Sequence, residues 1–161
     1  MLTDDIKQAA SELVDLLRAR GLTLSAAESC TGGWFAKSVV DVPGASAVFF
    51  GGVVSYVNEV KEKVLSVSRE DLAQYTAVSA PVAAAMAEGA RRLMGSDLAV
   101  SVTGLAGPGG GTPDIPVGRV YLGLAQAGKT ETVTLDLPGD REAVRMAAVL
   151  HMINEITKRL I

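Results

Sequence analysis

The spacing of apolar residues changes along the chain, and the changes mark where helices and strands are expected. Between Thr3 and Arg20 apolar residues recur every three or four positions, which is typical of an amphipathic helix, and Gly21 is a suitable C-cap. A second long helix is predicted over Ser79–Met94, because a Pro in the first turn favours a helix start. Asp140 is expected to cap a last helix that continues nearly to the end of the chain.

Short apolar runs rich in Val, Leu and Phe lie between these helices and predict strands. They cover Leu22–Ala27, Ala47–Tyr56, Leu98–Thr103, Val117–Ala127 and Thr130–Leu137. We expect a bulge at Gly51-Gly52 and a hairpin turn at Gly128. Short helices are predicted over 33–40, after a cap at Asn58, and after the capping pattern Ser68-x-x-Asp71.

The order of these elements predicts the architecture. Strands alternate with helices in the first two thirds of the chain, and an antiparallel hairpin follows. This order favours an α/β fold, a three-layer α/β/α sandwich with a mixed sheet, as a single domain over residues 1–161.

Composition narrows the classes of function. The 161 residues are 48% hydrophobic and 20% charged, which suits one globular domain with a sizeable core. The net charge of −3 and the absence of a basic stripe argue against a nucleic-acid partner. The lone Cys30 excludes an intrachain disulfide and a cysteine zinc cluster. With no long apolar run and no basic start of a signal peptide, we expect no membrane partner and a cytoplasmic protein.

The segment from Ala26 to Gly33 is the first candidate for chemistry, because a strand there leads into a helix. Ser29 at such a turn could attack a carbonyl while backbone N–H groups bind the oxyanion. The alternative is that Ser29 or Thr31 is only a helix cap. Cys30 is a rival nucleophile, although a lone cysteine is more often a packed residue.

A serine nucleophile needs a base, and the usual imidazole is scarce. His151 is the only histidine, and it lies among apolar residues of the last predicted helix, where packing is its expected role. A lysine can act instead if burial lowers its pKa. Lys61 follows an apolar strand closely, and Tyr56 adds a phenol before it. The alternative for Lys61 is an ordinary solvated surface lysine.

Two further features could bind an anion. The glycine-rich loop over 103–112 follows a buried strand, and successive glycine N–H groups can form a phosphate nest. It matches neither a P-loop nor a dinucleotide fingerprint, and an irregular connection is the alternative. Arg141 and Arg145 lie one turn apart on the last helix, where they could clamp a phosphate or simply be solvated.

Several segments together resemble one known family. They read AAESCTGGWFAKSV, FFGGVVSYVNEVKEKVLSV, AVS, VSVTGLAGPGGG, PVGRVYLGL and PGDREAVR, in that order. They are similar to the CinA C-terminal-domain family of competence/damage-inducible proteins, whose stand-alone members are nicotinamide-nucleotide amidases. The resemblance implies a three-layer α/β/α fold and hydrolysis of nicotinamide mononucleotide to nicotinic acid mononucleotide and ammonia. We expect no cofactor and no metal, because the sequence offers no cluster of metal ligands.

The same resemblance implies which residues form the site. Ser29 would be the nucleophile, Lys61 the base, and Tyr56 a relay or orienting group. The implied substrate contacts are Glu28, Cys30, Thr31, Gly32, Gly33, Asn58, Thr103, Gly104, Ala106, Gly107, Gly109, Gly110 and Arg145. Two positions depart from the family pattern: Ile115 stands where a lysine is frequent, and Val57 stands where a small polar residue is expected.

Two alternatives to this activity remain open at the level of sequence. The chain could be a non-catalytic nucleotide-binding regulatory module, or a serine hydrolase of unrelated amides. The expected partner is a small-molecule substrate. The Phe49-Phe50 pair and the apolar last helix are interpreted either as core or as an interface of a homo-oligomer.

Overall fold

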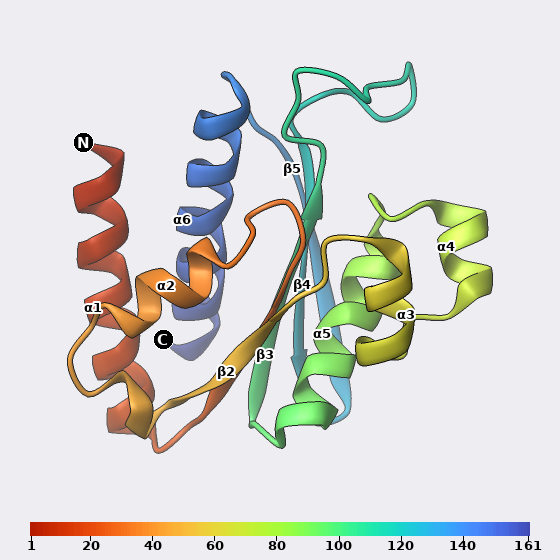
Figure 1. Cartoon of the computed structure of the whole chain (residues 1–161). Helices are drawn as coiled ribbons and strands as arrows, with labels where there is room; N and C mark the ends of the chain where they lie inside the picture. The colour runs from red at the N-terminus through yellow and green to blue at the C-terminus, as the bar shows by residue number, and fades with distance from the viewer.

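The computed structural model describes all 161 residues as six α-helices, one 3₁₀ turn and five strands (Figure 1). The helices are α1 (Leu2–Arg20), α2 (Trp34–Val40), α3 (Asn58–Leu65), α4 (Arg69–Tyr75), α5 (Ala80–Met94) and α6 (Arg141–Leu160). The strands are β1 (Leu24–Glu28), β2 (Phe49–Val54), β3 (Leu98–Gly104), β4 (Arg119–Gln126) and β5 (Lys129–Asp136).

The five strands form one mixed sheet in the order β2-β1-β3-β4-β5. β1 pairs in parallel with β2 and β3, whereas β3–β4 and β4–β5 are antiparallel. Helices α1, α2 and α6 cover one face and α3, α4 and α5 cover the other (Figure 1). The predicted three-layer α/β/α fold with a mixed sheet is therefore confirmed.

The two faces of the sheet are packed differently. The α1/α2/α6 side holds the main cluster of 26 buried apolar residues, whereas the cluster around α5 has 7. α5 lies very close to the sheet: the Ser101 hydroxyl of β3 donates a hydrogen bond directly to the Ala83 backbone carbonyl of the helix. A side chain at Gly123 of β4 would collide with that same carbonyl. Small residues at this contact bring α5 against the strands.

Most of the predicted helix ends are confirmed. Gly21 adopts a left-handed conformation after α1, with φ 64°. Ser68 accepts from the Asp71 N–H at the start of α4, and Asp140 accepts from the Ala143 N–H at the start of α6. Asn58 differs from the prediction: it is the first residue of α3, and Val57 occupies the cap position.

The strand prediction for Ala47–Tyr56 was too long at both ends. The chain forms a 3₁₀ turn over Ala45–Ala47 and enters β2 only at Phe49. The register against β1 shifts so that Phe50 is the extra residue, directly before the predicted bulge at Gly51-Gly52. Gly51 has φ 141°, which a residue with a side chain adopts only under strain.

The topology places a crevice at the carboxyl ends of the central strands β1 and β3. β1 and β3 are neighbours in the sheet. The helix that follows β1, α2, lies on one face of the sheet, and the helix that precedes β3, α5, lies on the other face. Ligands in α/β proteins bind at such a switch point, outside the carboxyl ends of the strands. Ser29 follows the end of β1, and the glycine-rich loop follows the end of β3.

Candidate active site

The structure brings Ser29 and Lys61 into direct contact across 32 positions of sequence. The Lys61 Nζ atom donates a hydrogen bond to Ser29 Oγ at 2.9 Å. The same Nζ donates to the backbone carbonyls of Ser55 at 2.6 Å and Tyr56 at 3.3 Å. Ser29 lies on the turn after β1, and Lys61 lies on α3, which the chain enters directly after β2. Parallel pairing of β1 with β2 thus brings the two side chains together.

Lys61 is an unusual lysine because it is buried without a counter-ion. Only 1% of its surface is exposed, and no carboxylate forms an ion pair with it. Burial disfavours the ammonium form and lowers the pKa of Lys61 from 10.5 to about 8. The expectation of an ordinary solvated lysine is therefore wrong for this residue.

The three contacts of Lys61 Nζ suit both of its protonation states. An ammonium group has three N–H donors, one for each of Ser29 Oγ, the Ser55 carbonyl and the Tyr56 carbonyl. A neutral amine keeps two donors for the carbonyls, which accept only, and its lone pair then faces the serine hydroxyl. The carbonyls therefore hold the amine in the orientation that a base for Ser29 needs.

The turn that carries Ser29 is fixed by a buried carboxylate. Glu28 is 1% exposed, and its oxygens accept from the backbone N–H groups of Phe35 at 2.9 Å and Ala36 at 3.0 Å and from the Thr31 hydroxyl. Glu28 therefore caps α2, and the interpretation of Ser29 or Thr31 as the cap is wrong. The predicted substrate contact of Glu28 is not supported either, because both carboxylate oxygens are used within the fold.

Ser29 and Lys61 lie in a cleft of about 270 Å³ at the carboxyl ends of the strands. Thirteen residues line it: Ser29, Cys30, Tyr56, Lys61, Ala77, Val78, Thr103, Gly104, Leu105, Ala106, Gly107, Gly109 and Arg141. Nine of these residues were predicted from the sequence as site residues. Ala77, Val78 and Leu105 could not be recognised as site residues from their chemistry, because they contribute only apolar side chains to the lining of the cleft.

Other predicted contacts lie outside this cleft. Thr31, Gly32, Gly33 and Arg145 line a separate hollow with Trp34 and Lys37. Gly110 and the exposed Asn58 line neither. Ile115, noted as a departure from the family pattern, also lies outside the cleft and exchanges hydrogen bonds with Thr112.

The two arginines of α6 have different environments, which sequence alone did not distinguish. Arg145 donates to the carbonyls of Cys30 at 2.9 Å and Thr31 at 3.3 Å and lies over the Trp34 ring, so it supports the turn from behind. Arg141 lines the cleft. It donates to the Gly107 carbonyl at 2.7 Å and to the Tyr56 hydroxyl at 3.1 Å.

Tyr56 does not occupy the relay position that was predicted. Its hydroxyl accepts from Arg141, and it makes no hydrogen bond to Ser29 or Lys61. Its backbone carbonyl, not its phenol, contacts the Lys61 amine. In this structure Tyr56 lines the cleft. Arg141 connects its side chain to the glycine-rich loop, because it donates both to the Tyr56 hydroxyl and to the Gly107 carbonyl.

Cys30 is a poor rival for Ser29. The residue is buried, and burial raises the pKa of its thiol to about 11. A thiol with that pKa is almost entirely protonated at neutral pH, and the thiolate is the nucleophilic form. The contact with a buried amine therefore singles out the Ser29 hydroxyl.

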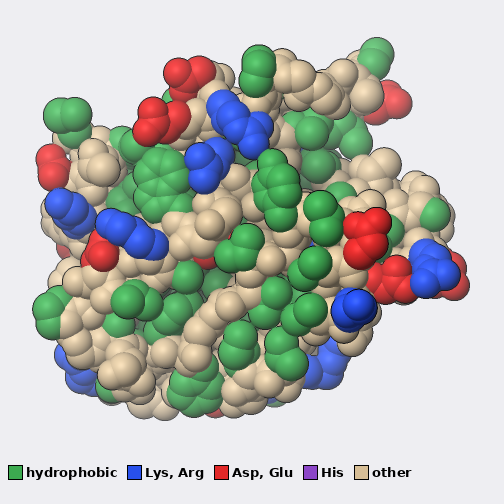
Figure 2. Space-filling model, in the orientation of Figure 1, with side chains coloured by type: hydrophobic (Ala, Val, Ile, Leu, Met, Phe, Trp, Pro, Cys, Tyr) green, Lys and Arg blue, Asp and Glu red, His purple; other side chains and the backbone are tan.

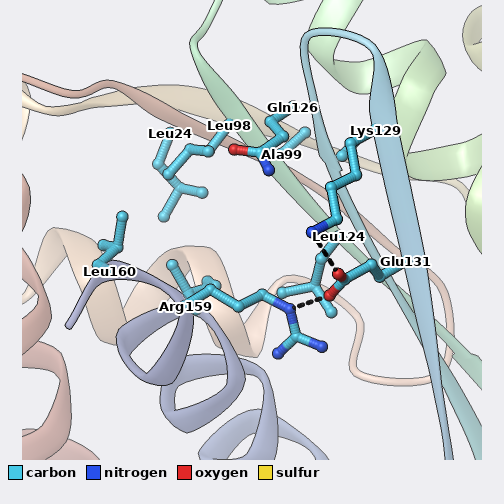
Figure 3. Close-up of a pocket in the computed structure, with 11 residues that line it drawn as sticks. Leu24, Leu98, Ala99, Leu124, Gln126, Lys129, Glu131, Arg159 and Leu160 are labelled. Carbon is cyan, nitrogen blue, oxygen red and sulfur yellow. Dashed lines mark hydrogen bonds and ion pairs between the residues drawn. The ribbon is translucent and has the colours of Figure 1, made fainter.

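A second cavity lies at the opposite end of the sheet (Figure 3). It has about 140 Å³ and is lined mainly by apolar residues from β1, β3, β4 and α6. Its cations, Lys129 and Arg159, both pair with Glu131, at 2.9 Å and 2.6 Å. It contains no serine, cysteine or buried unpaired amine, so its lining offers no chemistry comparable with that of the Ser29 cleft.

Comparison with known proteins assigns the family. The profile described as "CinA C-terminal domain" matches residues 6–160. The chain belongs to the CinA C-terminal domain family. A competence-damage inducible protein of Caldanaerobacter subterraneus subsp. tengcongensis is 48% identical over 97% of this chain and 38% of its own length. One from Desulforudis audaxviator is 56% identical over 84% of this chain and 33% of its own length.

Solved structures of CinA proteins agree with the fold along nearly the whole chain. The competence damage-inducible protein A of Klebsiella pneumoniae has a TM-score of 0.94 at 36% identity, with 96% of each chain covered. The competence/damage inducible protein of Agrobacterium tumefaciens has a TM-score of 0.93 at 37% identity, covering 97% of this chain and 95% of its own. This CinA domain spans only 38% and 33% of the lengths of the two curated relatives named above.

Proposed function

We propose that this CinA domain is an amidohydrolase that converts nicotinamide mononucleotide to nicotinic acid mononucleotide and ammonia. The observation that carries the proposal is the buried Lys61 amine, 2.9 Å from Ser29 Oγ, with a pKa lowered to about 8. A serine and a lysine so arranged suit acyl transfer from an amide. The substrate itself comes from the family resemblance.

In the proposed reaction neutral Lys61 accepts the hydroxyl proton as Ser29 Oγ attacks the carboxamide carbon. The backbone N–H group of Cys30, next to Ser29 in the cleft, has no backbone partner and is the donor we assign to the developing oxyanion. The ammonium of Lys61 then protonates the amide nitrogen, the C–N bond breaks and ammonia leaves. Water, deprotonated by Lys61, hydrolyses the acyl-enzyme and restores Ser29.

The substrate phosphate needs a cation, and Arg141 is the better candidate than Arg145. Arg141 lines the cleft, and its contacts with Gly107 and Tyr56 leave further guanidinium N–H groups unused. Arg145 is occupied with two carbonyls of the Ser29 turn. We therefore assign Arg145 a supporting role and place the phosphate near Arg141 and the glycine-rich loop.

The test is ammonia release by the purified protein from nicotinamide mononucleotide, with Ser29→Ala as the matched control. We expect turnover that the variant loses. Nicotinamide and nicotinamide riboside, which lack the phosphate, should be much poorer substrates. Equal turnover of all three amides would favour an unrelated amidase. Calorimetric binding of the mononucleotide without any ammonia release would instead favour the alternative, a non-catalytic nucleotide-binding module.

None of the helices combines the length and the apolar character that crossing a membrane requires. We keep the cytoplasm as the proposed location, because the substrate is a metabolite of the cell interior.

A further inference from the structure

Lys61 lies on α3, and the two sides of this helix differ sharply. The outer side is solvated: in Figure 2 charged side chains of both signs lie over α3 and α4, and Glu62 of α3 pairs with Arg69 of α4 at 2.7 Å. The inner side carries the buried residues Lys61 and Leu65. A surface ion pair contributes little to holding a helix in place. The contacts of the inner side therefore decide where α3, and with it Lys61, lies.

The turn that ends α3 is joined to the backbone of Lys61. The N–H groups of Ser66 and Val67 both donate to the Lys61 carbonyl, that of Val67 at 3.2 Å. Ser66 has φ 60° and ψ 30°, the left-handed conformation that closes a helix. Leu65 and Val67, on either side of it, are 0% and 1% exposed and belong to the apolar cluster around α5. Lys61 is thus held at its carbonyl by this turn and at its amine by the cleft.

α5 meets this turn at a glycine. Gly89 is a buried residue inside α5, and its φ is not positive, so its backbone conformation is open to any residue. Glycine inside a helix is unfavourable relative to alanine and needs a packing reason. A Cβ atom built on Gly89 would lie 2.8 Å from the Leu65 carbonyl carbon and closer still to its oxygen. The carbonyl end of α3 therefore occupies the space of the missing side chain.

We propose that Gly89 is a positioning residue for the reaction of the Ser29 cleft, because its missing side chain lets α3 lie where the Lys61 amine reaches Ser29 Oγ. The inference rests on the proposed function, in which Lys61 is the base. A methyl group at Gly89 would force the α3 backbone outward by on the order of 1 Å, because carbon atoms pack at about 3.5–4.0 Å. Lys61 Nζ would then leave its place 2.9 Å from Ser29 Oγ and 2.6 Å from the Ser55 carbonyl.

Gly89 acts on Lys61 only through the place of α3. Burial lowers the pKa of Lys61, and Cys30 is the one titratable neighbour that also affects it, in the opposite direction. Tyr56 and Arg141 share the cleft, but neither they nor the charged side chains of α3 and α5 change this pKa. Withdrawal of α3 would admit water to the amine. Because water stabilises the ammonium form, the pKa of Lys61 should rise toward its ordinary value of 10.5.

The experiment compares Gly89→Ala with Glu88→Gly. Glu88 is the neighbouring, exposed position, so its change to glycine weakens the helix propensity of α5 and adds nothing against α3. We expect Gly89→Ala to lower kcat at about pH 7 by about 10²-fold, the usual cost of a misplacement of about 1 Å. KM should change little, because Lys61 is the only α3 residue that lines the cleft. Part of the lost kcat should return at about pH 9–10, whereas Glu88→Gly should keep the wild-type profile.

A second pair of variants tests the other side of the same contact and serves if Gly89→Ala does not fold. Ser66 is exposed, so substitutions there leave the core intact. Ser66→Val disfavours the left-handed conformation and should change kcat and its pH profile in the same direction as Gly89→Ala. Ser66→Gly favours that conformation and should keep the wild-type kcat.

A measurement without substrate separates this inference from the proposed function. The amine of Lys61 is titrated by NMR in protein with isotope-labelled lysine, and its signal is assigned with Lys61→Met. We expect a higher pKa in Gly89→Ala and Ser66→Val than in the wild type. An unchanged pKa and kcat would overturn the proposal, as would a loss of stability with an unchanged pH profile, which indicates a structural role only. If the wild type released no ammonia while the pKa still shifted, the proposed function would fail and the placement of Lys61 by Gly89 would stand.

Discussion

Replacing Lys61 by arginine is the sharpest test of the proposed chemistry, because it keeps a cation and removes the base. The neutral amine is the active form in the proposed reaction, and an arginine guanidinium does not release its proton at physiological pH. We expect Lys61→Arg and Lys61→Ala to lose about 10²–10⁴-fold in kcat, the usual contribution of a general base. If Lys61 served only to bind the phosphate, the arginine variant would keep kcat and change KM.

The burial of Lys61 sets the size of the pH effect. With a pKa lowered to about 8, roughly a tenth of the amine is neutral at pH 7, against about one part in three thousand at the ordinary value of 10.5. Burial therefore increases the active form about 300-fold at neutral pH. Between about pH 6 and pH 8 kcat should rise roughly 50-fold and then reach a plateau.

The assay is steady-state ammonia release across about pH 5.5 to 9.5, with kcat and KM determined separately at each pH. The separation matters because a phosphate monoester also titrates, near about pH 6, and affects mainly binding. A kcat that stays flat from about pH 6 to 9, or an arginine variant with near wild-type kcat, would refute the role of Lys61 as general base.

Three further outcomes follow from the same site. Ser29→Ala should abolish turnover while Cys30→Ser keeps most of it, because the Cys30 thiol has its pKa raised to about 11; an active Ser29→Ala protein would contradict this. The pKa of Lys61 is lower in the folded chain than in the unfolded chain, so between about pH 8 and 10.5 the unfolded chain binds more protons than the folded chain. The free energy of unfolding should therefore rise across that window by up to about 3 kcal/mol. Denaturant titrations should show this rise, and Lys61→Met should lack it. Glu28→Gln should lower stability by about 1–3 kcal/mol in thermal unfolding, because an amide cannot accept from Phe35, Ala36 and Thr31 together; an unchanged melting temperature would contradict the capping role.

Much of the fold could be predicted because its signals are local. The periodicity of α1, the cap at Asp140 and the hairpin turn at Gly128 depend on residues within a few positions of one another. The errors occurred where a long-range contact decides the outcome. β2 begins at Phe49 and not at Ala47, because pairing with β1 starts only there and the preceding residues close a 3₁₀ turn.

The candidate site shows the same division. The sequence marked Ser29 at a strand-to-helix turn and Lys61 after an apolar strand, and the resemblance joined them into one proposal. The contact between them depends on the parallel pairing of β1 with β2, which no local pattern specifies. Arg141 and Arg145 are one turn apart on the same helix, so sequence could not show that one lines the cleft and the other supports the turn.

By itself, then, the sequence determined the class of fold and the residues able to do chemistry, because hydrophobic spacing, helix caps and turn residues depend only on positions close together in the chain. Burial and proximity were decided only by the tertiary structure. Packing removes Lys61 from water and so lowers its pKa, and it turns Glu28 inward as a helix cap. These effects arise between segments far apart in sequence, because desolvation and hydrogen bonding depend on which surfaces meet when the chain folds.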